Sequence, residues 1–197
     1  MERPAALSEF LTAVHAALAP TEEASAKQAV ERIFGALEQP ALVHAAEPVA
    51  PPSELADQFS LALRSAATAS APIANLASAF EQLAPLLRWA PRPGSDTDPQ
   101  FRRNHVNTAI VGPTGLEERS DVIVGAGLLN PRTHYPIHSH PPEELYVVMT
   151  DGEWYRDERQ WYCPGVGGVV YHPPNMTHAM RSLGAPLLAV WCLYVSR

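Results

Sequence analysis

The sequence predicts a mainly β protein in which a C-terminal β-barrel carries an α-helical N-terminal extension. The 197-residue chain changes character near residue 91. Before that point Ala, Leu and Glu are abundant, and apolar residues recur every three or four positions, as in amphipathic helices. After it, short apolar runs are separated by Gly and Pro, which is typical of short strands. We therefore predict a helical region over residues 1–90 that packs on a barrel over residues 91–197.

Four amphipathic helices are expected in the N-terminal region. Pro20 ends the first helix, because proline cannot continue the hydrogen-bonding pattern. Thr21 is expected to begin the second helix, Ser53 to cap the third, and Pro72 to lie in the first turn of the fourth. The predicted apolar faces are Leu7, Phe10, Leu11, Val14 and Leu18; Val30, Ile33, Phe34 and Leu37; Leu55, Phe59 and Leu63; and Leu76, Phe80, Leu83 and Leu87.

The C-terminal region is expected to contain several strands, each an apolar run bounded by turn-forming residues. Such a series of short strands favours a β-barrel or a β-sandwich. The predicted strands cover residues 106–111, 121–129, 145–150, 168–171 and 187–195.

The composition limits the classes of partner. The formal net charge is −7, which disfavours nucleic acids and anionic membranes as partners. No run approaches the roughly 18 apolar residues that a membrane-spanning helix needs, and the first residues lack the features of a signal peptide. We therefore expect a cytoplasmic protein with no nucleic-acid or membrane partner.

Two histidine-containing segments carry the candidate chemistry. The first is His138-x-His140-x3-Glu144; residues two apart in a strand share a face, so both imidazoles can lie side by side. The second ends at His178 after a Pro-Pro-Asn turn. Imidazole and carboxylate together suit zinc, iron, manganese, cobalt or nickel. We predict one divalent metal ion held by His138, His140, Glu144 and His178, with positions left open for substrate or water.

Two tyrosines are candidate catalytic residues. Tyr146 lies two residues after Glu144 in the same expected strand, so its hydroxyl should lie near the metal. A nearby cation favours the phenolate and lowers the pKa from about 10, which would make Tyr146 a general base. Tyr135, three residues before His138, either reaches the same cavity or packs at the start of a strand.

These segments resemble the two motifs of the cupin superfamily, whose fold is a double-stranded β-helix, or jelly roll. The sequence departs from the motifs at turns, where Gly is replaced near Arg132 and by Asn175. Asn tolerates a positive φ better than most residues, so the second turn is expected to survive. The resemblance implies a cupin barrel that binds one metal ion.

A longer stretch is similar to the cupin-type dimethylsulfoniopropionate lyases, whose shorter members also carry a helical region before the cupin. The matching segments are Val111-Gly-Pro-Thr-Gly115, Gly127-Leu-Leu-Asn-Pro131, Tyr135-Pro-Ile-His138-Ser-His140-Pro-Pro-Glu-Glu144-Leu-Tyr146, Asp151-Gly-Glu-Trp154 and Pro173-Pro-Asn-Met-Thr-His178.

This resemblance implies cleavage of dimethylsulfoniopropionate to acrylate and dimethyl sulfide. His140, Glu144 and His178 fall on metal-ligand positions of that family. His138 falls on the first histidine, which either ligates the metal or lies just outside its ligand shell.

The resemblance places Tyr146 on the tyrosine proposed as the base and Tyr135 on a second tyrosine of the pocket. Two alternatives stay open. An iron-dependent dioxygenase would use the same ligands and need oxygen, and Tyr146 would have no duty as a base. A non-catalytic small-molecule-binding cupin would bind ligand without turnover. The N-terminal helices either cover the barrel or form the contact of a homodimer.

Overall fold

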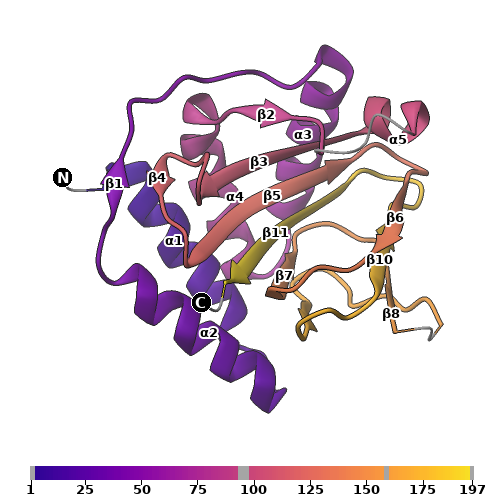
Figure 1. Ribbon diagram of the computed structural model, residues 1–197. Coiled ribbons are helices and arrows are strands. Elements are labelled where there is room, and N and C mark those ends of the chain that lie inside the picture. The colour runs from indigo at the N-terminus through magenta and orange to yellow at the C-terminus, as the bar shows by residue number, and fades with distance from the viewer. Residues whose placement is uncertain (1–2, 93–97, 158–159, 196–197) are drawn as a thin grey trace.

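The computed structural model describes residues 3–92, 98–157 and 160–195. Four long helices lie against one side of a large sheet, and a small sheet lies on its other side (Figure 1). The helices are α1 (Ala5–Leu18), α2 (Ala24–Leu37), α3 (Ser53–Ala66), α4 (Ala71–Leu83) and the short α5 (Pro99–Asn104).

The four predicted helices are present, with three corrections at their ends. Helix α2 begins at Ala24 and not at Thr21. Ser53 is the first residue of α3, and no side chain caps that helix. Helix α4 ends at Leu83, and Leu87 lies in extended chain. Pro85 explains this last difference, because its ring has no N–H to donate to the preceding turn.

The strands form two sheets within the described residues. The larger has the order β1-β4-β3-β5-β11-β7-β9, with β2 paired to β3, and the smaller has the order β6-β10-β8. The predicted mainly β architecture is confirmed, but as a two-sheet sandwich and not as one closed barrel. The strands are β1 (Leu42–Val43), β2 (Trp89–Ala90), β3 (His105–Val111), β4 (Glu117–Glu118), β5 (Val122–Leu129), β6 (His134–His138), β7 (Glu143–Val148), β8 (Glu153–Arg156), β9 (Val169–His172), β10 (His178–Arg181) and β11 (Leu187–Tyr194).

The large sheet separates two apolar cores. Successive side chains of a strand point to opposite faces. On β7, Leu145 and Val147 therefore join the core beneath the helices, whereas Tyr146 and Val148 join the core between the sheets. By the same alternation Glu144 faces the space between the sheets, so the helices support the back of this strand.

The predicted boundary near residue 91 stays a prediction. Strands β1 and β2 come from the first 90 residues, yet they pair with β4 and β3 of the C-terminal region. Part of the Pro-rich segment at the boundary, residues 93–97, lies outside the described residues. Among the helices that the structure describes, none combines the length and apolarity needed to span a bilayer.

A buried carboxylate ties the N-terminus to the sheet. Glu117 on β4 is fully buried, and its carboxylate accepts hydrogen bonds from Arg3, Arg119 and the backbone N–H of Ala41. Burial by itself would raise the pKa of Glu117, but these donors, Arg3 foremost, outweigh it and lower the pKa. Glu117 is therefore charged at neutral pH and is the counter-ion of Arg3, whereas Arg119 also pairs with Asp121.

Replacing Glu117 with Ala should lower the free energy of unfolding by about 3 kcal/mol, because the largely buried Arg3 would lose its counter-ion, whereas Arg119 would keep Asp121. Glu118→Ala is the matched control. Glu118 is exposed and pairs with the exposed His44, so its loss should change stability by less than about 1 kcal/mol. Urea denaturation at neutral pH measures both variants. Equal losses would contradict the role assigned to Glu117.

Candidate metal centre

The predicted ligands come from three segments that the two sheets bring together. His138 is the last residue of β6, and His178, the first residue of β10, lies directly opposite it in the small sheet. Glu144 lies on β7 of the large sheet, opposite His172 of β9. The expectation that His138 and His140 share a strand is wrong, because β6 ends at His138 and His140 lies in the loop to β7.

Two turns hold these segments in place. Asn175 has a φ of 62°, so the expectation that this turn survives without Gly is confirmed. Its backbone N–H donates a hydrogen bond of 2.9 Å to the carbonyl of His140, which joins the two histidine-bearing loops. Arg132, at the other departure from the cupin motifs, also takes a positive φ, of 59°. Both positions therefore keep the backbone shape that Gly would favour.

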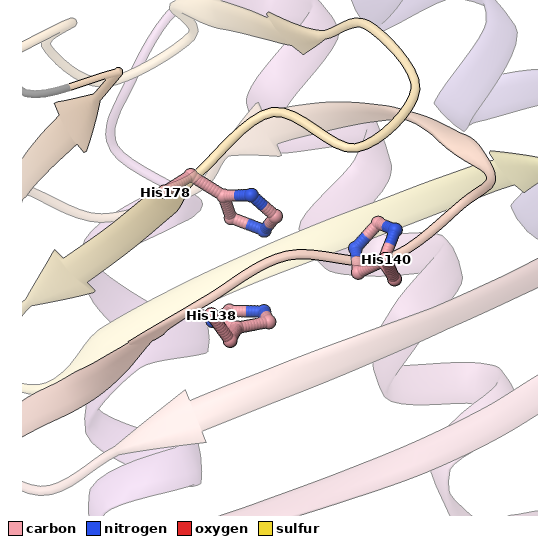
Figure 2. A group of neighbouring side chains, drawn as sticks. All are labelled: His138, His140 and His178. Carbon is pink, nitrogen blue, oxygen red and sulfur yellow. The ribbon is translucent and has the colours of Figure 1, made fainter.

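The three predicted histidines are oriented alike. In each of His138, His140 and His178, the Nδ1 atom lies next to a backbone carbonyl two residues away, at 2.9, 3.0 and 2.8 Å respectively. A carbonyl oxygen only accepts, so Nδ1 carries the proton and Nε2 presents a lone pair. Figure 2 shows the three imidazoles directed toward a shared space. One ligand atom from each lies within 4.8 Å of the other two.

Glu144 completes the arrangement. It is buried, and its Oε2 atom lies 3.2 Å from the Nε2 atoms of both His140 and His178. Burial would raise the pKa of Glu144, but the histidines around it, His140 first, outweigh burial and hold the pKa well below its usual range. Glu144 therefore places a negative charge among the imidazoles.

His172 belongs to this cluster, although sequence analysis left it out of the ligand set. Its ring stacks on that of His178 with centroids 4.1 Å apart, and its Nδ1 lies 3.7 Å from Glu144 Oε2. It is buried, and neither ring nitrogen has a hydrogen-bond partner among the described residues. Strand alternation could have identified it, because Val170 of the same strand faces the core between the sheets.

The donor set fits a divalent cation. With Nδ1 protonated, the lone pair on Nε2 of His178 faces a Glu144 carboxylate oxygen 3.2 Å away, and two acceptors so close repel each other. A positive charge between them removes the repulsion. Buried nitrogen atoms without partners, on His172 and on Nε2 of His178, indicate the same need. Imidazole and carboxylate are ligands that several divalent metals accept.

Two of these imidazoles, His138 and His172, are neutral near pH 7. Burial, with a smaller effect from His178, lowers the pKa of His138 to about 3, and burial lowers that of His172 to about 4. His140 differs. Burial would lower its pKa, but the hydrogen bond and charge of Glu144 outweigh burial and raise the pKa. A metal ion would therefore compete with a proton mainly at His140.

The two predicted catalytic tyrosines both reach the cluster. Tyr146 is buried with its ring 5.7 Å from that of His172, and the ring of Tyr135 lies 4.9 Å from that of His138. Burial, followed by the charge of Glu144, raises the pKa of Tyr146 well above 10. Burial raises the pKa of Tyr135 to about 12. Among the protein groups alone, both tyrosines keep their protons.

A two-sheet sandwich that encloses a cluster of histidines and a glutamate defines the chain as a cupin, as the sequence motifs predicted. The chain belongs to the dimethylsulfoniopropionate lyase family, whose sequence profile matches residues 25–189. That is a family of carbon–sulfur lyases, so the predicted family is confirmed.

Individual relatives agree with this assignment. Over 58 residues the chain is 33% identical to dimethylsulfoniopropionate lyase DddQ of Ruegeria pomeroyi, a segment that spans 29% of each protein. The crystal structure of DMSP lyase DddQ from Ruegeria pomeroyi DSS-3 matches with a TM-score of 0.72 at 22% identity, covering 98% of this chain and 93% of that one. A chain from the crystal structures of DMSP lyases RdDddP and RnDddQII matches with a TM-score of 0.71 at 23% identity. This match also covers 98% of the present chain and 93% of that one. At these identities the structures show the shared fold.

Metal affinity should fall as the pH is lowered, by up to about tenfold per pH unit while His140 takes up its proton. The raised pKa of His140 places this dependence around and above the ordinary value of 6.5. Competition with a chelator across about pH 6 to 8 measures it. His140→Ala should bind more weakly but with a flatter pH profile, whereas His44→Ala, at an exposed histidine, should keep the wild-type slope. A wild-type affinity that does not change with pH would contradict the competition at His140.

Proposed function

We propose that this chain is a metal-dependent lyase that cleaves dimethylsulfoniopropionate to acrylate and dimethyl sulfide by β-elimination. One observation supports the proposal most directly: the buried Glu144 carboxylate lies 3.2 Å from the Nε2 atoms of two imidazoles, with two tyrosines beside them. Membership of the lyase family supplies the reaction class.

Four residues would hold the ion, namely His138, His140, Glu144 and His178, with His172 next to them. A divalent cation bound there would polarise the substrate carboxylate, stabilise the charge that develops on it, and offset the Glu144 charge that raises the pKa of Tyr146.

Tyr146 is proposed as the base. Its phenolate oxygen takes the proton from the carbon next to the substrate carboxylate. The electron pair of that C–H bond forms the C=C bond of acrylate, and the adjacent C–S bond breaks with its electrons on sulfur. Dimethyl sulfide leaves as a neutral molecule. The tyrosine then carries the proton, which it loses to solvent before the next turnover.

The surroundings of the cluster suit a zwitterionic substrate. The core between the sheets is rich in aromatic rings, among them Trp154 and Trp191. A sulfonium group next to such a ring gains roughly 0.5–2 kcal/mol without needing a carboxylate partner. These rings also exclude water, which strengthens the electrostatic interactions of the reacting groups.

Wild-type protein loaded with a divalent metal should release dimethyl sulfide from dimethylsulfoniopropionate, measured by headspace gas chromatography. Tyr146→Phe should lower kcat by about 100-fold or more, because the base is lost, while the bound metal per chain stays unchanged. Tyr155→Phe is the matched control. Tyr155 lies on β8, the next strand along the chain, and this variant should keep its activity. Full activity in Tyr146→Phe would remove Tyr146 as the base. No gas from the wild type with any of several metals would remove the substrate.

Oxygen separates the lyase from the dioxygenase alternative. Elimination changes no oxidation state, so acrylate should form at the same rate in anaerobic and aerated solution. Liquid chromatography of acrylate, with ferrous iron as the loaded metal in both arms, measures this. A strict need for oxygen would favour the dioxygenase, and ligand binding without turnover in both arms would favour the non-catalytic cupin.

A further inference from the structure

The chain directly after β2 brings a positive charge to the edge of the candidate metal centre. Arg92 is half-buried, and its guanidinium carbon lies 5.1 Å from the centre of the Tyr135 ring. That ring is in turn 4.9 Å from the ring of His138. The Tyr135 ring therefore lies close both to the guanidinium and to a predicted metal ligand.

The charge of Arg92 acts on several titratable groups of the site. Burial has the largest effect on the pKa of each of these groups, and the charge of Arg92 by itself lowers the pKa of every one. The groups affected are His105, Tyr135, His138, His140 and Tyr146. These groups come from β3, β6, β7 and the loop between β6 and β7, and the guanidinium lies near them, over the Tyr135 ring.

Arg92 has no carboxylate partner among the described residues, and unlike Arg88, which also has none there, it is half-buried and lies against an aromatic ring beside the metal centre. Arg32 pairs with Glu143, and Arg181, which also lies over an aromatic ring, pairs with Glu153. Glu144, the carboxylate of the metal centre, is already surrounded by histidines. A half-buried guanidinium has a planar set of donors that matches a carboxylate, so an anionic ligand would satisfy it.

We propose that Arg92 binds the carboxylate of the substrate and so selects small carboxylates for this site. The identity of that carboxylate rests on the proposed function; the carboxylate-binding role does not. Arg92 attracts the negative end of a zwitterion and repels its sulfonium, so it also determines which end of the molecule lies on the Tyr135 side. The guanidinium forms charge-assisted hydrogen bonds to the carboxylate and takes no part in proton transfer.

The test uses the full, metal-loaded chain with propionate, an unreactive carboxylate, and propionamide, its neutral counterpart. Calorimetry should show that Arg92→Ala weakens propionate binding roughly tenfold and leaves propionamide binding unchanged. Arg92→Lys should recover part of the affinity, because it restores the charge without the planar donors. Arg88→Ala removes the same charge from an exposed position four residues earlier and should bind propionate as the wild type does.

Kinetics gives a second readout. With dimethylsulfoniopropionate, Arg92→Ala should raise KM roughly tenfold and change kcat by less than about threefold, as expected when a binding contact common to ground and transition states is lost. If Arg92 only packs on Tyr135, the variant should unfold at a lower temperature while its propionate affinity stays at the wild-type value, and that result overturns the proposal. Absence of propionate binding in the wild type, or equal weakening by Arg88→Ala, also overturns it.

The two proposals can fail separately. If the wild type releases no dimethyl sulfide but binds propionate through Arg92, the substrate is wrong and the carboxylate site stands. If gas is released and Arg92→Ala leaves KM and propionate affinity unchanged, the lyase stands and the role of Arg92 is wrong.

Discussion

A negative charge buried between two sheets is the constraint on which the site depends. Glu144 cannot stay ionised in an apolar interior unless positive or donor groups surround it. The structure meets this need with imidazoles from β9, β10 and the loop before β7. The three predicted ligand histidines donate their Nδ1–H groups to backbone carbonyls, which leaves their Nε2 atoms directed toward the shared space. That arrangement suits a bound cation.

Neighbouring glutamates on β7 connect the helical region to this site. Glu143 and Glu144 are consecutive, so they point to opposite faces of the large sheet. The Glu143 carboxylate forms an ion pair with Arg32 of α2 through both of its oxygen atoms. It also accepts a 3.0 Å hydrogen bond from the Tyr171 hydroxyl. Tyr171 precedes His172 on β9, so the same alternation applies to both strands. The helices thereby fix the back of the two strands that carry Glu144 and His172, although none of their side chains enters the cluster's ligand set.

The site joins groups that favour opposite protonation states. Glu144 stabilises positive charge on His140, yet it raises the pKa of the buried Tyr146. A general base among these groups therefore needs more positive charge than the protein side chains provide. The half-buried Arg92 supplies some of it from the Tyr135 side. Tyr146 can thus act as a base only if positive charge is added to that of the four proposed ligands, either by a bound ion or by Arg92.

Local patterns in the sequence determined the four helices, the histidine–glutamate motifs, the turn at Asn175 and five of the strands, because each depends on residues close together in the chain. Those strands are β3, β5, β7, β9 and β11. The tertiary structure alone decided the rest. The two-residue strands are too short to show a periodicity. His140 lies outside β6, in the loop that contains Pro141 and Pro142. His172 and Arg92 acquire their roles from contacts with residues distant in sequence, through the pairing of β9 with β7 and the packing on Tyr135. No local pattern encodes such contacts, since they depend on how the two sheets and the helices come together.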